Sequence, residues 1–254
     1  EIAATWLAAG LDPERVVFYR QSDVPEVTEL TWLLTCVTAK GLMNRAHAYK
    51  AVVDANRAAQ PPLDEDAGVS MGLYSYPVLM AADILLFGAH QVPVGRDQVQ
   101  HIEMARDIAQ RFNHLYGPDL LVLPEAVVDE RAATVPGLDG RKMSKSYDNI
   151  IPLFAGGERA LRDAVMRVVT DATPPGTAKD PQQSTLFKIV QAFSLDAAEQ
   201  ADFERRHRAG ESWGQLKEAA FELLNRHLRP HRERYEHYMA HPHLVEAYLH
   251  KGGE

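Results

Sequence analysis

The sequence predicts an α/β protein in which helices cover both faces of a parallel sheet, followed by an all-helical domain. Up to about residue 150, short apolar runs alternate with amphipathic segments, as in strands connected by helices. Beyond that point only helical patterns follow, with prolines between them. The 254 residues are 46% hydrophobic and 24% charged, which is enough apolar material for a core. We therefore expect two domains, 1–150 and 151–254.

The first domain should contain three short strands. A strand is expected where an apolar run of four or five residues lies between turn-forming residues. Helices are expected where apolar residues recur every three or four positions, and Pro77 should open one of them. The predicted strands are 15–19, 91–94 and 120–123, and the predicted helices are 1–9, 23–41, 77–87 and 97–112.

The second domain should contain helices alone. Their apolar residues repeat at helical spacing, and Pro174, Pro175 and Pro230 separate them. The predicted helices are 158–169, 184–193, 197–208, 213–227, 232–239 and 244–250.

Composition and charge exclude several classes of protein. The net charge is −8; residues 204–254 carry 9 Lys and Arg against 8 Asp and Glu, so the negative charge lies before them. Such a chain does not coat nucleic acid broadly, although a local docking surface remains open. No run of about 18 apolar residues is present, so no membrane span is expected. The single cysteine, Cys36, excludes an internal disulfide and should be a buried thiol.

The strongest motif is the run KMSKS, which comprises Lys142, Met143, Ser144, Lys145 and Ser146. It follows a glycine-bounded turn at residues 137–140. Lysines act as mobile point charges and hydroxyls as short-range donors, so such a loop can close on a polyphosphate. The alternative is a solvated basic loop without a ligand.

A second motif, VPVGRDQ, runs from the end of a predicted strand into a helix. Ligands of open α/β sheets bind at such strand ends. Gly95 allows close approach of the backbone, Asp97 can accept from ribose hydroxyls, and Gln98 can donate and accept. In the alternative reading, Asp97 only caps the helix and Gln98 lies on the surface.

A third group of residues lies on or beside the predicted helix 77–87. Met80 and Asp83 are three positions apart and therefore share a face, and Tyr76 lies near that face. A carboxylate among apolar neighbours needs a partner. An aromatic ring, a thioether and one carboxylate would together suit a flat ligand that carries an N–H group. The alternative is a core helix with Asp83 bonded to local backbone.

Together the three motifs resemble a known family. KMSKS is the second signature of class I aminoacyl-tRNA synthetases, and YPVLMAADIL and VPVGRDQVQH resemble the bacterial tryptophan–tRNA ligases. The resemblance runs from about Leu11 to about Tyr248. It implies a Rossmann-like catalytic domain followed by a helical tRNA-binding domain. Such an enzyme joins L-tryptophan and ATP into tryptophanyl-adenylate, releases pyrophosphate, and transfers the tryptophanyl group to tRNA(Trp).

The resemblance also implies roles for individual residues. Asp83 would accept the indole N–H and Met80 would pack on the ring, while Tyr76 and Gln98 would hold the α-amino group. Val92 and Val94 would line the pocket. The ATP-binding residues would be Gly95, Arg96 and Asp97 at the ribose, the backbone of Val135 at adenine, and Lys142, Met143, Ser144, Lys145 and Ser146 at the phosphates together with Mg²⁺. Lys142 and Lys145 would be the catalytic residues.

The family implies further partners and a location. It is dimeric, and Trp32 and Leu33 lie on a helix that sits near its interface, although both could be core residues instead. The protein would be a cytoplasmic homodimer. Arg205–Arg208 and Arg229–Arg234 could touch tRNA phosphates, or form a solvated helix face. The histidine pairs at 227/231 and 237/241 lack an evident third ligand, so no protein-bound metal is expected.

The sequence departs from the family pattern in one large respect. The family's first signature, of the His-x-Gly-His type, is absent, because His47, His90, His101 and His114 do not occur in that context. The family's closing helix, expected beyond Lys251, is absent too. We interpret the sequence as an internal portion of a longer enzyme and expect the 254 residues alone to be inactive; a natural truncation is the alternative. A tyrosine-specific relative and a non-catalytic paralogue that binds an amino acid or tRNA remain open as well.

Overall fold

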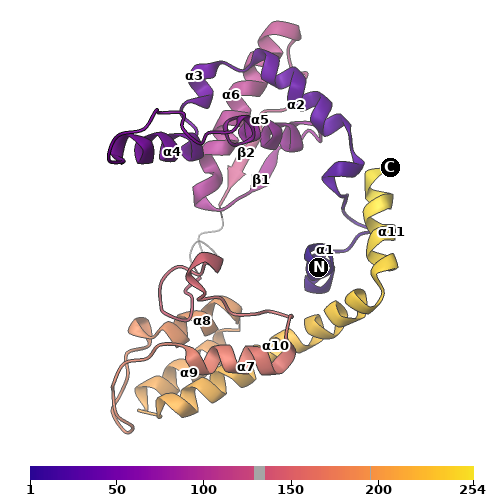
Figure 1. Cartoon of the computed structure of the whole chain (residues 1–254). Helices are drawn as coiled ribbons and strands as arrows, with labels where there is room; N and C mark the ends of the chain where they lie inside the picture. The colour runs from indigo at the N-terminus through magenta and orange to yellow at the C-terminus, as the bar shows by residue number, and fades with distance from the viewer. Residues whose placement is uncertain (129–134, 195) are drawn as a thin grey trace. The chain divides into compact units, whose positions relative to one another are not determined.

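The computed structural model describes residues 1–128, 135–194 and 196–254. It consists of two compact units (Figure 1). Unit 1 combines Glu1–Arg20 with Thr134–Glu254, and unit 2 is Gln21–Ala133. These bounds differ from the expected division at residue 150. The expected division was placed where the strand patterns stop, and it stays a prediction.

Unit 2 holds the parallel strands and the helices around them. Its core is formed by apolar side chains of α2, α5 and α6, which pack against one another; Val27, Leu34, Ala82 and Ile108 are at most 1% exposed. The elements in chain order are η1 (Gln21–Asp23), α2 (Glu26–Val37), α3 (Lys40–Met43), α4 (His47–Ala58), α5 (Met71–Leu85), β1 (Gln91–Pro93), η2 (Arg96–Gln98), α6 (Val99–Tyr116) and β2 (Glu125–Val127).

The sheet of unit 2 is parallel, as predicted. β1 pairs with β2, with Val92 opposite Ala126, and α6 connects the two strands. The strand expected at 91–94 is therefore confirmed, but the strand expected at 120–123 is wrong. The side chain of Asn113 occupies both backbone groups of Leu121, donating to its carbonyl at 2.8 Å and accepting from its N–H at 2.9 Å. The strand forms only beyond that contact.

The strand expected at 15–19 is also wrong. No regular element covers this segment, and the side chains of Val16 and Val17 are 42% and 69% exposed. An apolar run becomes a strand only where a neighbouring strand takes up its backbone hydrogen bonds. Here the backbone of Phe18 lies instead against Gly252, where an added Cβ would stand 2.1 Å from the Phe18 carbonyl oxygen.

Two helices of unit 2 differ from their predicted bounds. α2 ends at Val37, and its buried face is Val27, Leu34 and Val37. Cys36 is exposed, contrary to expectation, because two residues correspond to about 200° around a helix and place it opposite Leu34. α5 begins at Met71, not at Pro77, since the hydroxyl of Ser70 caps it by accepting from the Leu73 N–H at 3.1 Å.

Unit 1 is helical. It contains α1 (Ile2–Ala9), α7 (Gly157–Arg167), α8 (Thr185–Phe193), α9 (Ala197–Arg208), α10 (Trp213–Ala240) and α11 (Pro242–Gly253), with short turns η4 (Lys145–Tyr147) and η5 (Pro181–Gln183). α10 packs against α1, α7 and α8. The break expected at Pro230 does not occur, because Leu228, Arg232 and Tyr235 on either side are buried and hold the helix together.

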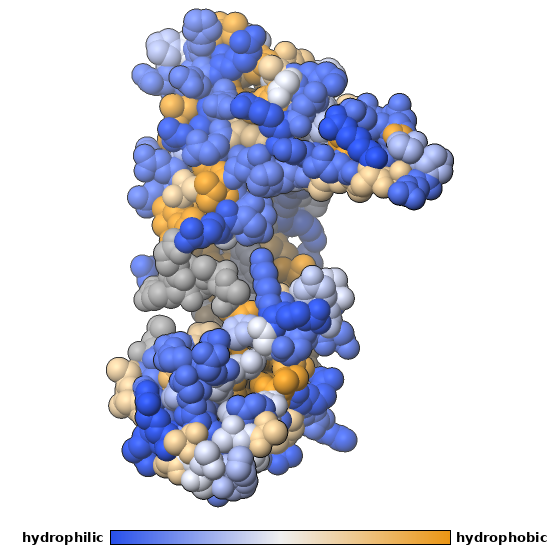
Figure 2. All heavy atoms as spheres, turned by 90° about the vertical axis from the view of Figure 1, so that its left-hand side faces the viewer, coloured by the Kyte–Doolittle hydropathy of each residue, from blue (hydrophilic) through white to orange (hydrophobic). Residues whose placement is uncertain are grey.

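The visible face of each unit is mostly hydrophilic, with hydrophobic side chains gathered in small patches (Figure 2). None of the described helices is both long and apolar enough to cross a bilayer.

Candidate functional site

The predicted site residues divide between the two units. Unit 2 carries those expected to bind tryptophan and the ATP ribose, and unit 1 carries Val135 and the KMSKS run. We describe each group within its own unit.

One face of α5 presents the residues expected to recognise tryptophan. Tyr76, Met80 and Asp83 follow one another at spacings of four and three, so they line up along the helix. All three side chains are half-buried, whereas Val78, Ala81 and Ala82 on the other face are in the core. The helix thus keeps its polar and soft groups accessible at the edge of the core.

The carboxylate of Asp83 has a partner that sequence reasoning missed. Nε2 of Gln21 donates to both carboxylate oxygens, at 2.8 and 2.9 Å. The partner is therefore a side chain 62 residues away, not the local backbone. A neutral amide orients the carboxylate without cancelling its charge, which leaves Asp83 able to accept from a ligand N–H.

The residues after β1 turn directly into α6. Val92 and Val94 are half-buried, and Gly95 leads into η2. An added Cβ at Gly95 would stand 2.7 Å from Oδ1 of Asp97, so only glycine fits this turn without a shift. Nε2 of Gln98 donates to Oδ2 of Asp97 at 3.1 Å. The N-cap of α6 is Gln98, without a side-chain cap, so Asp97 does not cap this helix.

A second missed residue, His101, stands behind Tyr76. Nε2 of His101 lies 2.8 Å from the Tyr76 hydroxyl, and the two rings are tilted at 44° with centroids 5.4 Å apart. His101 is 6% exposed, and its Nδ1 has no hydrogen-bond partner. Burial, and then the nearby His47, lower the pKa of His101, while Asp97 acts in the opposite direction. Burial and His47 both favour the neutral imidazole.

In unit 1 the KMSKS run forms a loop that Asn149 holds in shape. Asn149 is 3% exposed; its amide nitrogen donates to Oδ1 of Asp139 at 2.7 Å and to the Lys142 carbonyl at 3.2 Å, and its Oδ1 accepts from the Ser144 N–H at 2.8 Å. An added Cβ at Gly137 would stand 2.3 Å from this amide, so the turn needs a glycine there.

Within this loop, Met143 is anchored against the core of unit 1, whereas the side chains of Lys142 and Lys145 are exposed. Met143 packs against the core of unit 1, and its N–H donates to the Val135 carbonyl at 3.0 Å. Lys142 and Lys145 are exposed, and neither has an ion-pair partner among the described residues. The hydroxyls of Ser144 and Ser146 lie 2.8 Å apart. Two unpaired ammonium groups beside two hydroxyls form a surface that attracts phosphate.

Asp139 also helps to hold this loop in shape by accepting hydrogen bonds from Asn149 and Arg141. Its pKa is lowered first by the hydrogen bond from Asn149, and then by hydrogen bonds from Arg141. The carboxylate is thus engaged in holding the turn, and Lys142 and Lys145 remain available for a ligand.

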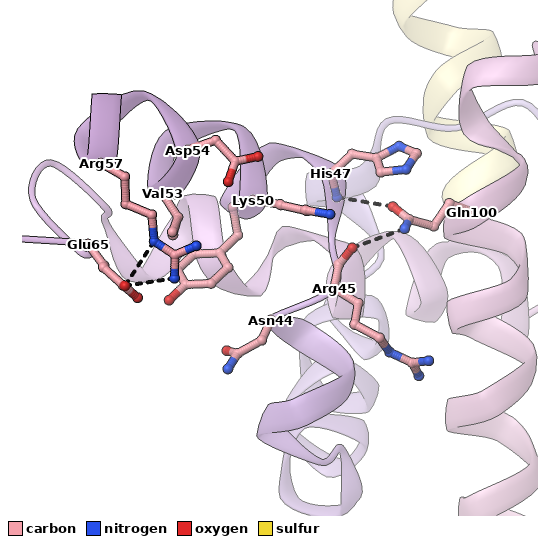
Figure 3. A pocket seen from close by; sticks show the side chains of 10 residues that line it. Asn44, Arg45, His47, Lys50, Val53, Asp54, Arg57, Glu65 and Gln100 are labelled. Carbon is pink, nitrogen blue, oxygen red and sulfur yellow. Dashed lines mark hydrogen bonds and ion pairs between the residues drawn. The ribbon is translucent and has the colours of Figure 1, made fainter. Parts of the chain in front are cut away.

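The described residues of unit 2 also form a pocket of about 490 Å³ that contains none of the predicted site residues. Figure 3 shows Gln100 bridging two backbone groups on its wall: Oε1 accepts from the His47 N–H and Nε2 donates to the Arg45 carbonyl, both at 3.0 Å. Arg57 on another wall is paired with Glu65 at 2.7 Å.

Three of the arginines considered for tRNA contact, Arg205, Arg206 and Arg208, are already paired within unit 1. Arg206 lies 2.7 Å from Glu211, and Arg208 lies 2.7 Å from Glu204. Arg205 is paired with Asp202. These pairs favour the solvated helix face over a free phosphate-binding surface. Within the described parts of the chain, no group of three or more His, Cys, Asp or Glu side chains could hold a metal ion.

The fold and these motifs define a class of protein. Residues 1–229 match the family model described as tRNA synthetases class I (W and Y), and the chain belongs to that family. Its α/β unit with parallel strands and its helical part are the Rossmann-like and helical portions of that fold.

Similar proteins within this family are tryptophan–tRNA ligases. The chain is 64% identical over 252 residues to the tryptophan–tRNA ligase of Bordetella parapertussis, and 62% identical over 253 residues to that of Xanthomonas axonopodis pv. citri. It covers 55% and 58% of these proteins, and so spans somewhat more than half of their length. A crystal structure of tryptophanyl-tRNA synthetase from Campylobacter jejuni, complexed with ADP and tryptophan, aligns with a TM-score of 0.85 at 43% identity, covering 99% of this chain and 75% of that one.

Proposed function

We propose that the protein containing this chain is a tryptophan–tRNA ligase. It activates L-tryptophan with ATP to tryptophanyl-adenylate and transfers the tryptophanyl group to tRNA(Trp). The observation that carries the proposal is the 43% identity and TM-score of 0.85 with a structure that holds ADP and tryptophan. The identities of 62–64% to curated tryptophan–tRNA ligases support the same substrate.

Tryptophan would bind against the accessible face of α5. The Asp83 carboxylate, oriented by Gln21, accepts the indole N–H, and Met80 packs on the ring. Val92 and Val94 form the apolar wall. Tyr76 and Gln98 accept from the α-ammonium group. Asp83 is half-buried, so a ligand donor can reach its carboxylate and form a charge-assisted hydrogen bond.

ATP would be held by residues of the VPVGRDQ and KMSKS motifs and by Val135. Gly95, Arg96 and Asp97 bind the ribose, and the backbone of Val135 meets adenine. In the reaction, a carboxylate oxygen of tryptophan attacks the α-phosphorus, and the bond from that phosphorus to the bridging oxygen breaks. The leaving pyrophosphate takes the electron pair. Lys142 and Lys145, with the hydroxyls of Ser144 and Ser146, stabilise the charge that grows on it.

Mg²⁺ would accompany the phosphates and share their charge. Around the KMSKS run, Asp139 is engaged by Asn149 and Arg141, and the described residues offer no cluster of metal ligands. We therefore assign no protein carboxylate to the ion, which the phosphate oxygens of ATP would carry.

The proposal includes a cytoplasmic homodimer. Its support is the surface of α2, where Trp32 and Leu33 are 68% and 54% exposed. Their exposure excludes the core role considered for them within this chain. Large apolar side chains that stand together on a helix are typical of residues that a partner covers.

The decisive experiment is ATP–pyrophosphate exchange with the protein expressed from its complete reading frame. Tryptophan should support exchange and tyrosine should not. Exchange with tyrosine alone would identify the tyrosine-specific relative. Tryptophan binding without any exchange would identify the non-catalytic paralogue.

A further inference from the structure

His101 is a buried group to which the proposed function gives no role. It lies on α6, 6% exposed, and the only hydrogen bond of its side chain among the described residues joins Nε2 to the Tyr76 hydroxyl at 2.8 Å. A buried histidine with one nitrogen unpartnered costs stability, so its retention in the core calls for a physical reason. Among the described residues, Tyr76 is the side chain whose hydrogen bond connects His101 to the site face of α5.

The charge state of His101 decides what it can offer to that hydroxyl. Burial lowers its pKa, and so does the nearby His47 on α4, while Asp97 in η2 raises it. A neutral imidazole carries one acceptor nitrogen and one N–H. When Nε2 is the acceptor, the Tyr76 proton points into the core. Both lone pairs of the phenolic oxygen then face away from His101.

A ligand ammonium group needs the Tyr76 hydroxyl oxygen as an acceptor, with the hydroxyl proton pointing away from the ligand. All its N–H groups donate, so the tyrosine must accept, and a hydroxyl proton aimed at the ligand would oppose binding. We propose that His101 is a positioning residue for the α-amino group of the substrate: when the ammonium group binds, Nε2 of His101 accepts a hydrogen bond from the Tyr76 hydroxyl on the core side and leaves the hydroxyl oxygen as an acceptor. This inference rests on the proposed function, because it takes Tyr76 as the contact to the ammonium group.

Ligand binding and protein packing favour different tautomers. Without a ligand, a bare Nδ1 lone pair is cheaper to bury than an unpaired Nδ1–H, so Nε2–H is the less costly form. The ammonium group reverses this preference because it rewards the form in which Nε2 accepts. His101 therefore contributes to discrimination between tryptophan and indole compounds that lack the amino group.

The test uses the full-length protein with three substitutions. His101→Leu removes the acceptor at similar volume, His101→Gln retains one, and Tyr76→Phe removes the hydroxyl. His114→Ala, at an exposed position of the same helix, is the matched control. Equilibrium dissociation constants are measured for tryptophan and for indole-3-propionate, which has the ring and carboxylate but no amino group. Thermal unfolding checks that each variant is folded.

His101→Leu should weaken tryptophan binding about 10-fold to 100-fold, the range of one hydrogen bond to a charged group. Indole-3-propionate binding should change less than threefold, a free-energy change of under about 0.7 kcal/mol. His101→Gln should recover part of the loss, His114→Ala should have no effect, and in a Tyr76→Phe background His101→Leu should cost little more. If His101→Leu weakens both ligands equally, or acts undiminished without the hydroxyl, the inference is wrong.

Failure of the proposed function would look different. An unmodified protein that binds no tryptophan would overturn both proposals. Normal tryptophan binding that is indifferent to His101 would overturn only the positioning role. If His101→Leu does not fold, His101→Gln carries the test: equal losses for tryptophan and indole-3-propionate would then contradict the inference.

Discussion

The pairing of Asp83 with Gln21 shows how a single residue can acquire its role from a distant part of the chain. An aspartate among apolar residues of a helix needs a partner. The amide of Gln21 supplies it at 2.8 and 2.9 Å while leaving the negative charge in place. The carboxylate is thereby held still for a further donor. Its role as the acceptor of the indole N–H can be tested directly.

We expect Asp83→Asn to weaken tryptophan binding strongly. The Gln21 amide would attract the oxygen of the new side chain, so the Asn nitrogen would turn toward the indole N–H, donor against donor. A site that pairs a ligand N–H can reject analogues that lack it by about 10⁴–10⁵-fold, and much of that ratio should be lost. Equilibrium binding of tryptophan checks this, with Asp107→Asn on the exposed surface as the control. Unchanged affinity would remove Asp83 from the pocket.

Lys145→Ala should slow tryptophanyl-adenylate formation and leave tryptophan binding unchanged. The ammonium group is exposed and has no described ion-pair partner, so it is free to meet charge that appears only in the transition state. Removing one such group typically costs about 10²–10³ in rate. Pre-steady-state adenylate formation in the full-length protein measures the effect. A rate within about threefold of the unmodified protein, against the hundredfold expected, would favour a solvated loop.

At the scale of elements, the KMSKS run depends on residues outside the motif. Asn149 binds Asp139, Lys142 and Ser144 at once, and Gly137 leaves room for its amide. The motif therefore presents its lysines because a buried amide fixes the backbone beneath them. Loop order should therefore respond to changes at Gly137, which lies outside the KMSKS run.

Gly137→Ala should disturb this loop and destabilise unit 1. The new methyl group would stand 2.3 Å from the Asn149 amide, and relieving such overpacking costs about 1–3 kcal/mol. Urea unfolding and limited proteolysis near residues 142–146 measure stability and loop order. Gly214→Ala is the matched control, because nothing lies within 4 Å of the position that an added Cβ would take, and alanine favours helix by up to about 1 kcal/mol. If Gly137→Ala and Gly214→Ala had the same stability and the same proteolysis near residues 142–146, the contact between Gly137 and Asn149 would not support the loop.

At the scale of the whole molecule, unit 1 is assembled from both ends of the chain. α1 packs on α10, where Leu7 is 3% exposed and the Ala8 carbonyl accepts from Nε of Arg234 at 3.0 Å. Nδ1 of His231 lies 2.9 Å from the same carbonyl oxygen. The first residues are thus part of the core that supports the KMSKS loop.

Leu7→Ala should destabilise unit 1 by about 2–5 kcal/mol, the usual cost of a cavity at a buried leucine. Hydrogen exchange of backbone amides in α10 should speed up accordingly. Ile2→Ala on the same helix is the control, because Ile2 is 76% exposed and its loss should change exchange little. If the two variants exchange alike, the contact between α1 and α10 does not contribute to stability.

The local pattern predicted most helices and the motif residues, but prolines and strands needed tertiary context. α10 runs through Pro230 because buried neighbours on both sides pack against other helices, which outweighs one missing hydrogen bond. β2 begins at Glu125 because Asn113 occupies the backbone of Leu121. Hydropathy shows neither the continuation of α10 through Pro230 nor the start of β2 at Glu125. Each depends on a side chain elsewhere in the chain or on a packed neighbour.

The sequence by itself determined the family and the α/β and helical character, and it predicted the residues of the candidate site, because these depend on residue types at short spacing. Only the tertiary structure decided which groups complete that site. Gln21 and His101 are 62 and 25 residues from the side chains they hold, and Asn149 binds the side chain of Asp139, 10 residues away. Their hydrogen bonds arise from burial and from the packing of separate elements, so no local sequence pattern predicts them.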